Sequence, residues 1–383
     1  MPAAAPAVVA APRSPPYARF VPPRSIGPYE ILSVIGRGGI GTVYRARHRE
    51  TGEVAALKLL GPPPACDPIA ARRLAREFEA LRCLDHPNVV RVHAAGVHEG
   101  YSYLAMELVQ GLDLRSYLSP CLDELPELPG RLDARPSPLV HGIDVWSDEP
   151  ETGSLLTPAE EGPPSGPDAI RAFAALMEEA ETDPRARPAQ GSGERSSDPP
   201  DVIDAPLPSP LLERLNAPAR LRRLEDAVCQ VCDGLAYVHR RGLVHRDLKP
   251  SNIMVDDGRR VRLMDFGLVK LASDSLHLTQ HGRAVGTYRY MAPEQARGEP
   301  VDHRADLYSL GVILFELVCG RPPFLARRPT QLWGDIVSRV PPPVESLNPA
   351  ANPRLARLAE RLLAKEPLRR IASAEEVAAA LRG

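Results

Sequence analysis

Two short stretches of the chain bring together the side chains that phosphoryl transfer requires. Residues 245–252 read HRDLKPSN, and residues 265–267, thirteen positions beyond Asn252, read DFG. Transfer of a phosphoryl group needs a carboxylate to orient the attacking hydroxyl, a cation near the γ-phosphate and oxygen ligands for Mg²⁺. Asp247 can supply the first, Lys249 the second, and Asn252 and Asp265 the third.

A glycine-rich stretch is the second candidate for phosphate chemistry. Residues 36–43 read GRGGIGTV and lie between two β-like patterns. Glycines at 36, 38 and 41 would let backbone N–H groups approach phosphate oxygens without a Cβ in the way. A glycine-rich hairpin turn explains the same residues, so this signal is weak alone. It is not a dinucleotide fingerprint, because a strand pattern rather than a helix follows it.

Lys58 is notable against the composition of the chain. The sequence has 43 arginines and only four lysines, and Lys58 ends a β-like run. A compact ammonium group can reach between two phosphates where a planar guanidinium would not fit. Glu77, on the inward side of the expected next helix, would hold it, although a single glutamate on a helix is more often simply solvated.

The elements that must position these residues can be read from hydrophobic spacing. A hairpin is expected from a strand that starts at Tyr29 and a second run at 54–60, followed by a helix at 67–84 and strand-like runs at 89–93 and 101–109. Helical spacing marks 220–238, 305–319, 354–364 and 374–381. The pattern predicts a small lobe built from a sheet and one helix, then a second, mainly helical lobe.

Composition divides the chain further. The net charge is −2, but residues 119–217 carry 20 acidic and 7 basic residues, so they sum to −13 and the remainder to +11. This stretch also holds 17 of the 43 prolines, which predicts a disordered acidic insertion, with a docking or regulatory segment as the alternative. Residues 1–28 are rich in proline, basic and free of acid, and are expected to be a flexible leader.

Other classes of protein are disfavoured by composition. A near-neutral chain with 43% hydrophobic residues is neither a collagen nor a protein that binds nucleic acid through its overall charge. The longest apolar run, 308–319, contains Glu316 and is too short to cross a membrane. The six cysteines are scattered except for Cys229 and Cys232, whose spacing fits one helix face better than a metal or redox site. We therefore expect a cytoplasmic protein.

With further motifs, the ordered series resembles the eukaryotic-like serine/threonine protein kinases of bacteria. Gly286-Thr287 and Ala292-Pro293-Glu294 follow the two stretches above, and Asp306 and Arg370 come later. The resemblance covers 29–118 and 218–383. It implies an α+β, two-lobed protein kinase fold, with 29–118 as the N-lobe, the hinge and the start of the C-lobe, and 218–383 as the C-lobe. The insertion 119–217 is the large departure from the family pattern.

The resemblance also implies roles for individual residues. Asp247 would be the catalytic base with Lys249 beside it, Lys58 would pair with Glu77, and Asn252 and Asp265 would hold Mg²⁺. Glu294 and Arg370 would form a buried ion pair, and Asp306 would brace the catalytic loop. Leu81, His245 and Phe266 would belong to the hydrophobic column that aligns the lobes. The residues implied for the ATP site are Ile35, Gly36, Gly38, Gly41, Val43, Ala56, Lys58, Met106, Glu107, Val109 and Met254.

Substrate and regulation follow from the same comparison. Lys249, and Thr287 ahead of the stretch 290–294, fit the serine/threonine pattern, and we expect protein substrates rather than a small metabolite. Arg246 is typical of kinases whose activation loop is phosphorylated, and Thr279 is the expected site of that phosphorylation. A homodimer would allow one copy of the chain to phosphorylate the other. The expected cofactors are ATP and Mg²⁺, with Mn²⁺ as a substitute. The alternative function is a catalytically weak kinase-fold scaffold that acts through the insertion.

Overall fold

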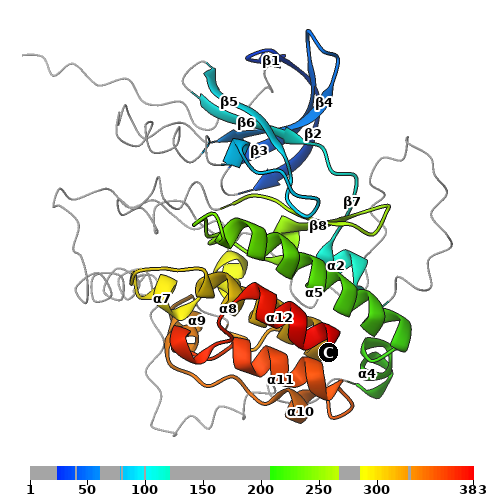
Figure 1. Ribbon diagram of the computed structural model, residues 1–383, viewed down its shortest axis with the longest axis vertical. Coiled ribbons are helices and arrows are strands. Elements are labelled where there is room, and N and C mark those ends of the chain that lie inside the picture. The colour runs from blue at the N-terminus through cyan, green and yellow to red at the C-terminus, as the bar shows by residue number, and fades with distance from the viewer. Residues whose placement is uncertain are drawn as a thin grey trace, which may run out of the picture.

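A computed structural model describes residues 24–38, 41–60, 78, 81–98, 101–120, 208–266, 285–326 and 329–383. The described residues form two lobes (Figure 1). The first half of the chain builds a sheet, and the second half builds a body of helices, coloured green to red. A small second sheet lies where the two lobes meet. This arrangement agrees with the two-lobed α+β fold expected from the sequence.

The sheet of the first lobe has six strands, and every neighbouring pair is antiparallel. In spatial order they are β1 (Ser25–Ile26), β2 (Tyr29–Gly38), β3 (Gly41–His48), β4 (Val54–Leu60), β6 (Tyr101–Glu107) and β5 (Val92–His98). The β2–β3 hairpin contains the glycine-rich stretch, with Gly38 opposite Gly41 at its end. Lys58 lies on β4, opposite Val43 on one side and Leu104 on the other.

Three details differ from the elements expected from sequence. The sequence suggested 54–60 as the hairpin partner of the strand that starts at Tyr29. In the structure the partner of β2 is β3, which begins inside the glycine-rich stretch, and 54–60 forms the strand after it. Residues 25–26, assigned to the leader, form β1, and Ile26 is fully buried. The run at 89–93 contributes only its last two residues to β5, because Val89 instead makes a parallel bridge to Leu263 of the other lobe.

Alternation along the strands gives this sheet two buried faces. Leu57 and Tyr103 point to one face, where they pack with Tyr29 and Tyr44. Their neighbours Ala56, Leu104 and Met106 point to the other, where they pack with residues that include Val90 and, from the helical lobe, Val238. The second face therefore joins the two lobes in one apolar cluster, and it is the face that carries the residues expected at the ATP site.

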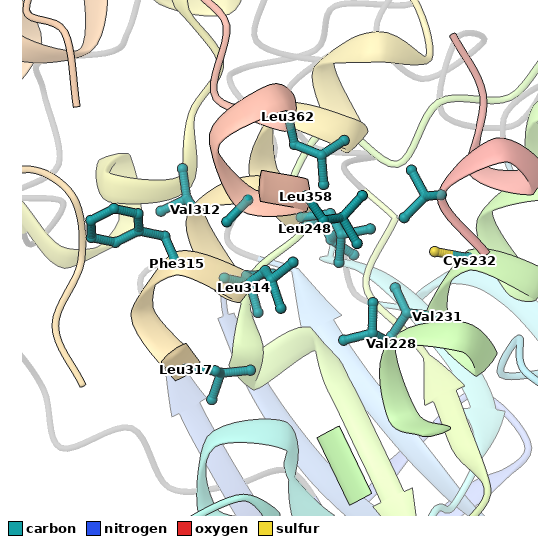
Figure 2. Packing of buried hydrophobic residues seen from close by; sticks show 14 of the residues in the cluster. Val228, Val231, Cys232, Leu248, Val312, Leu314, Phe315, Leu317, Leu358 and Leu362 are labelled. Atoms are coloured by element: carbon teal, nitrogen blue, oxygen red, sulfur yellow. The ribbon is translucent and has the colours of Figure 1, made fainter. Parts of the chain in front are cut away.

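Three helices build the core of the second lobe. They are α5 (Pro218–His239), α8 (Arg304–Cys319) and α11 (Pro353–Leu362), and each was expected from its spacing. Figure 2 shows Val228 and Val231 of α5, Leu314 of α8 and Leu358 of α11 converging on one apolar centre. α8 is capped by Gly320, the residue after its last turn, whose positive φ of 72° suits a residue without a Cβ. α12 (Ala374–Arg382) packs on α5 and starts at a Ser373 cap.

Shorter elements connect these helices. They are β7 (Gly111–Asp113), α2 (Leu114–Tyr117), α4 (Ser209–Leu215), η3 (Pro250–Asn252), β8 (Ile253–Asp256), β9 (Val261–Leu263), η4 (Val285–Tyr290), α7 (Pro293–Ala296), α9 (Pro329–Val337), α10 (Val344–Leu347) and η5 (Pro367–Arg369). The strands β7, β8 and β9 form the second sheet in that order. Residues 245–252 precede β8, and residues 265–266 follow β9, so the described parts of both candidate motifs meet at the junction between the lobes.

One buried arginine holds the two ends of the expected insertion together. Arg220 of α5 is 1% exposed, and its guanidinium donates to the carbonyl oxygens of Leu118, Leu215 and Leu317, each at 2.8 Å. Leu118 comes immediately before the segment 119–217, and Leu215 lies inside it, on α4. Residues 208–217 are therefore part of the folded lobe, and the boundary expected at 217 is too far along the chain.

The ion pair expected between Glu294 and Arg370 is present and buried. Arg370 Nη1 and Nη2 lie 2.6 and 2.7 Å from the two carboxylate oxygens of Glu294. The same guanidinium donates to the carbonyls of Arg304, Ala364 and Lys365, so one side chain joins α7, α8 and the segment after α11.

The described part of the chain contains no helix that combines the length and the apolar character of a membrane span.

Candidate active site

Asp247, Lys249 and Asn252 lie together in the loop before β8. Lys249 Nζ is 3.1 Å from Asp247 Oδ2. Asn252 Nδ2 donates to the same carboxylate oxygen at 3.1 Å and to the backbone carbonyl of Asp247 at 2.8 Å. Because the amide nitrogen of Asn252 faces Asp247, the amide oxygen of Asn252 is left to bind a cation. The loop thus presents a nearly buried carboxylate with an ammonium group beside it.

Asp306, at the start of α8, fixes the backbone of this loop through hydrogen bonds. Its carboxylate accepts hydrogen bonds from the backbone N–H groups of His245 at 2.7 Å and Arg246 at 2.8 Å, and it lies 2.8 Å from His239 Nε2. Burial alone would raise the pKa of Asp306, but the hydrogen bond and charge of His239, together with His245, hold this pKa below its ordinary value. The bracing role expected for Asp306 is therefore present in the geometry.

Asp265 stands opposite the loop, at the end of β9. Its carboxylate Oδ2 lies 2.8 Å from Lys58 Nζ, so a side chain from β4 and one from the second sheet meet across the junction. Asp265 has a positive φ of 59°, and the N–H of the preceding Met264 donates to the carbonyl of Asn252 at 3.0 Å. A carboxylate and an amide oxygen on adjacent turns are hard oxygen donors, which is the chemistry that Mg²⁺ requires.

The hydrophobic column expected from the motif residues is in contact. The rings of His245 and Phe266 are 4.6 Å apart, and Phe266 packs against the apolar cluster that contains Leu81. Burial lowers the pKa of His245, against the opposing charges of Asp306 and Asp247. His245 Nε2 lies 3.0 Å from the carbonyl of Met264, so Nε2 carries a hydrogen and donates to that oxygen.

The residues expected around adenine come from both lobes. Ala56 of β4 lies opposite Met106 of β6, and both side chains are buried in the cluster that also takes in Val43 and Val109. Met254 comes from β8 of the other lobe and is half-buried. We call Ala56, Met106 and Met254 the adenine slot. Ile35 is 49% exposed at the glycine-rich hairpin, and Gly36 lies opposite Val43 in the same hairpin.

Several expected residues are not placed, or only in part. Glu77 and Thr279 lie outside the described residues, so the expected pairing of Lys58 with Glu77 stays a prediction, and Asp265 is the partner that the structure gives to Lys58. Only the backbone of Gly38, Gly41 and Thr287 is described, Thr287 within η4. Arg246 has a positive φ of 63°, which turns the chain directly ahead of Asp247.

The segment around 290 contains contacts that the sequence did not suggest. The hydroxyl of Tyr290 donates to Glu316 at 2.6 Å and accepts from Arg115 at 2.7 Å, while Ser309 donates to the Tyr290 carbonyl. Burial, together with the charge of Glu316, raises the pKa of Tyr290. Gln295 joins this segment to the catalytic loop by donating to the Arg246 carbonyl at 2.9 Å. These partners come from distant parts of the chain, and no short motif contains them.

The order and contacts of these residues can be compared with known families. A sequence model described as protein tyrosine and serine/threonine kinase matches residues 29–375. The chain belongs to the protein kinase family. The match runs through both lobes and across the segment 119–217, and it confirms the family that the motifs predicted.

Two named relatives come from bacteria. A probable serine/threonine-protein kinase of Streptomyces coelicolor is 28% identical, the alignment covering 93% of this chain and 40% of that protein. Serine/threonine-protein kinase pkn3 of Myxococcus xanthus is 30% identical, with 92% and 49% covered. The chain thus spans less than half the length of these relatives. The crystal structure of the Mycobacterium tuberculosis PknI kinase domain shares the fold at 24% identity, with a TM-score of 0.53, 96% of this chain and 99% of that one being covered.

Proposed function

We propose that this chain is a serine/threonine protein kinase that transfers the γ-phosphate of ATP to hydroxyl groups of protein substrates. The observation that carries the proposal is the meeting of two polar groups across the lobes. Asp247, Lys249 and Asn252 form a contact group in one loop, and Lys58 and Asp265 form a 2.8 Å ion pair beside it. A scaffold typically lacks one of these four catalytic positions (Lys58, Asp247, Asn252, Asp265), and this chain has all of them.

Asp247 is the group that orients the substrate. Its carboxylate accepts the proton of the serine or threonine hydroxyl as that oxygen bonds to the γ-phosphorus and the bond to ADP breaks. Lys249, 3.1 Å from the carboxylate, pairs with Asp247 and places a positive charge next to the transferred group. Asn252 fixes the rotamer of Asp247, because its amide donates to both the carbonyl and the carboxylate of that residue.

Nucleotide binding is shared between the lobes. The adenine slot takes the base, with backbone groups of Glu107 and Val109 as hydrogen-bonding partners, and the β2–β3 hairpin covers the phosphates. Lys58 provides a cation for the phosphates and is held by Asp265 until nucleotide binds. A divalent metal, Mg²⁺ or Mn²⁺, would be held by Asp265 and the amide oxygen of Asn252, and when bound it would neutralise phosphate charge.

We also propose that Thr279 is autophosphorylated and that Arg246 receives the phosphate. The phosphate would add a charge near −2 at pH 7, which pairs with a guanidinium and orders the loop that carries it. If two copies of the chain phosphorylate each other, the initial rate per molecule rises with protein concentration. A cytoplasmic location in a bacterium completes the proposal and rests on the composition and on the bacterial relatives.

The test is phosphorylation of the phosphatase-treated protein with Mg²⁺ and labelled ATP, beside Asp247→Asn, followed by mass spectrometry. Label at Thr279 in the wild type and none in the variant is the expected result. Asp247→Asn keeps the size of the side chain and should still bind nucleotide. If neither protein is labelled while both bind ATP, the chain is either a kinase that needs an external activator or the scaffold. Label at another hydroxyl would retain the kinase and remove the role of Thr279.

A further inference from the structure

An ion pair connects the hinge side of the first lobe to the second sheet. Arg262 Nη2 of β9 lies 3.0 Å from Glu107 Oε1 at the end of β6. The side chains are 16% and 33% exposed, so the contact is partly screened from water. Neither residue belongs to the group around Asp247, and the family motifs do not contain Arg262. The role proposed above for Glu107 uses only its backbone, so the ion pair between the two side chains is not yet accounted for.

Glu107 is held from both sides. One carboxylate oxygen meets Arg262, and the other accepts from the backbone N–H of Arg91 at 3.4 Å. The backbone of Glu107 is also fixed, since its N–H donates to the Arg91 carbonyl at 2.9 Å. Glu107 follows Met106 directly, and Met106 is one wall of the adenine slot. A movement of the Glu107 side chain would thus be transmitted to that wall.

Arg262 is also the neighbour of Met254, an expected adenine residue of the second sheet. It lies directly across from Met254 in the β8–β9 pairing, and Met254 is the part of the adenine slot that belongs to the second sheet. Its guanidinium is oriented mainly by Glu107: Nε lies 4.0 Å from Asp256 and, among the described residues, is buried without a hydrogen-bond partner. One charged contact therefore joins the end of β6, where Met106 lies, to the position on β9 that pairs with Met254.

We propose that Arg262 is a positioning residue for the nucleotide, which sets the separation between the hinge and β8 through Glu107. This inference rests on the proposed kinase function and extends it. The ion pairs of Arg262 are with Glu107 and Asp256 and not with the residues around Asp247, so its loss should weaken binding of MgATP and leave the catalytic group unchanged. The effect should appear in the dissociation constant of the nucleotide, and the turnover number should be retained.

The experiment measures the Kd of MgATP by calorimetry, and kcat on a protein substrate, for the full chain and its variants. Arg262→Ala should raise Kd by about fivefold, a size typical of a partly exposed ion pair, with kcat within about twofold. Arg262→Lys should bind nearly as well as the wild type, because a single nitrogen makes the contact and the unpartnered Nε is removed. Arg260→Ala is the matched control: it removes the same charge from an exposed position two residues away, and Arg260 contacts Asp256 only through its backbone.

A second route to the same pair guards against misfolding of one variant. Glu107→Gln removes the charge but keeps the hinge backbone, and it should raise Kd as Arg262→Ala does. The double variant should then be no worse than either single variant. Additive effects, an unchanged Kd in Arg262→Ala, or a loss confined to kcat would each overturn the inference. If the wild type itself does not bind MgATP, the proposed function fails instead.

Discussion

His245 shows how a single buried side chain makes this site sensitive to pH. Its Nε2 donates to the Met264 carbonyl, and its Nδ1 is buried and has no partner among the described residues. Protonation would place a hydrogen on Nδ1 where no described acceptor receives it. Burial therefore disfavours the charged ring and lowers the pKa of His245, against the opposing charges of Asp306 and Asp247.

The first prediction concerns His245→Phe. Because the folded pKa lies below the unfolded value of about 6.5, the unfolded state binds more protons in this window, and stability falls as pH drops from about 6.5 towards the folded pKa. The variant should lose this part of the pH dependence while being less stable by about 1 kcal/mol at pH 8, where only the hydrogen bond to Met264 is lost. Urea unfolding between pH 8 and 5 measures both. Parallel curves for the two proteins would contradict the assignment.

Residues in short motifs could be predicted from the sequence, whereas pairs between distant residues could not. Asp247, Asn252 and Asp265 lie in contiguous stretches whose chemistry is specific, so the sequence alone indicates that they act together. Glu107 and Arg262 are ordinary charges on two separate strands, and nothing local shows that they meet. The same holds for Arg115 and Glu316, which meet directly at 2.6 Å and both bond to the hydroxyl of Tyr290.

At the scale of elements, long helices were predicted well because their apolar spacing is repeated over several turns. α5 and α8 match the expected ranges within a few residues. The short strands were harder. β3 begins inside the glycine-rich stretch, where glycine hides the alternation, and β1 is a two-residue strand at the end of a proline-rich segment. These strands depend on pairing with β2, which is information that a local pattern does not contain.

The crossing of α8 and α11 gives the second prediction. Gly311 of α8 lies so close to α11 that an added Cβ would be 2.7 Å from Leu362 Cβ and 3.1 Å from its backbone carbon. Gly311→Ala should therefore destabilise the protein by about 1–3 kcal/mol, since both helices must move apart. Gly334→Ala on α9 is the matched control, because its Cβ would meet nothing within 4 Å and alanine favours a helix. Thermal unfolding compares them, and equal effects would contradict the close crossing.

At the scale of the whole molecule, the structure explains how a long acidic segment can interrupt the helical lobe. The two ends of the segment are fixed to the same guanidinium, since Arg220 binds the carbonyls of Leu118 and Leu215. A second contact lies next to it in sequence: the side-chain amides of Asn216 and Asn348 form two reciprocal hydrogen bonds, at 2.9 and 3.1 Å. The fold of the lobe is thus closed on itself at the base of the segment, and the cost of closing a longer loop rises only slowly with its length.

This closure leads to the last prediction, which compares two deletions. Replacing 121–207 by a Gly/Ser linker of about ten residues keeps α4 and the hydrogen bonds of both Arg220 and Asn216. The melting temperature should therefore stay within about 2 °C of that of the full chain. Extending the deletion to 217 removes α4 and Asn216, and with them the carbonyl that Arg220 Nη1 binds and the amide that Asn348 binds. Buried polar groups that lose a partner cost about 1–3 kcal/mol each, so the melting temperature should fall by about 5 °C or more. Calorimetry of the two proteins distinguishes these outcomes. If both deletions melt alike, Arg220 does not close the base of the segment, and if both lose several degrees, residues within 121–207 contribute to the fold of the lobe.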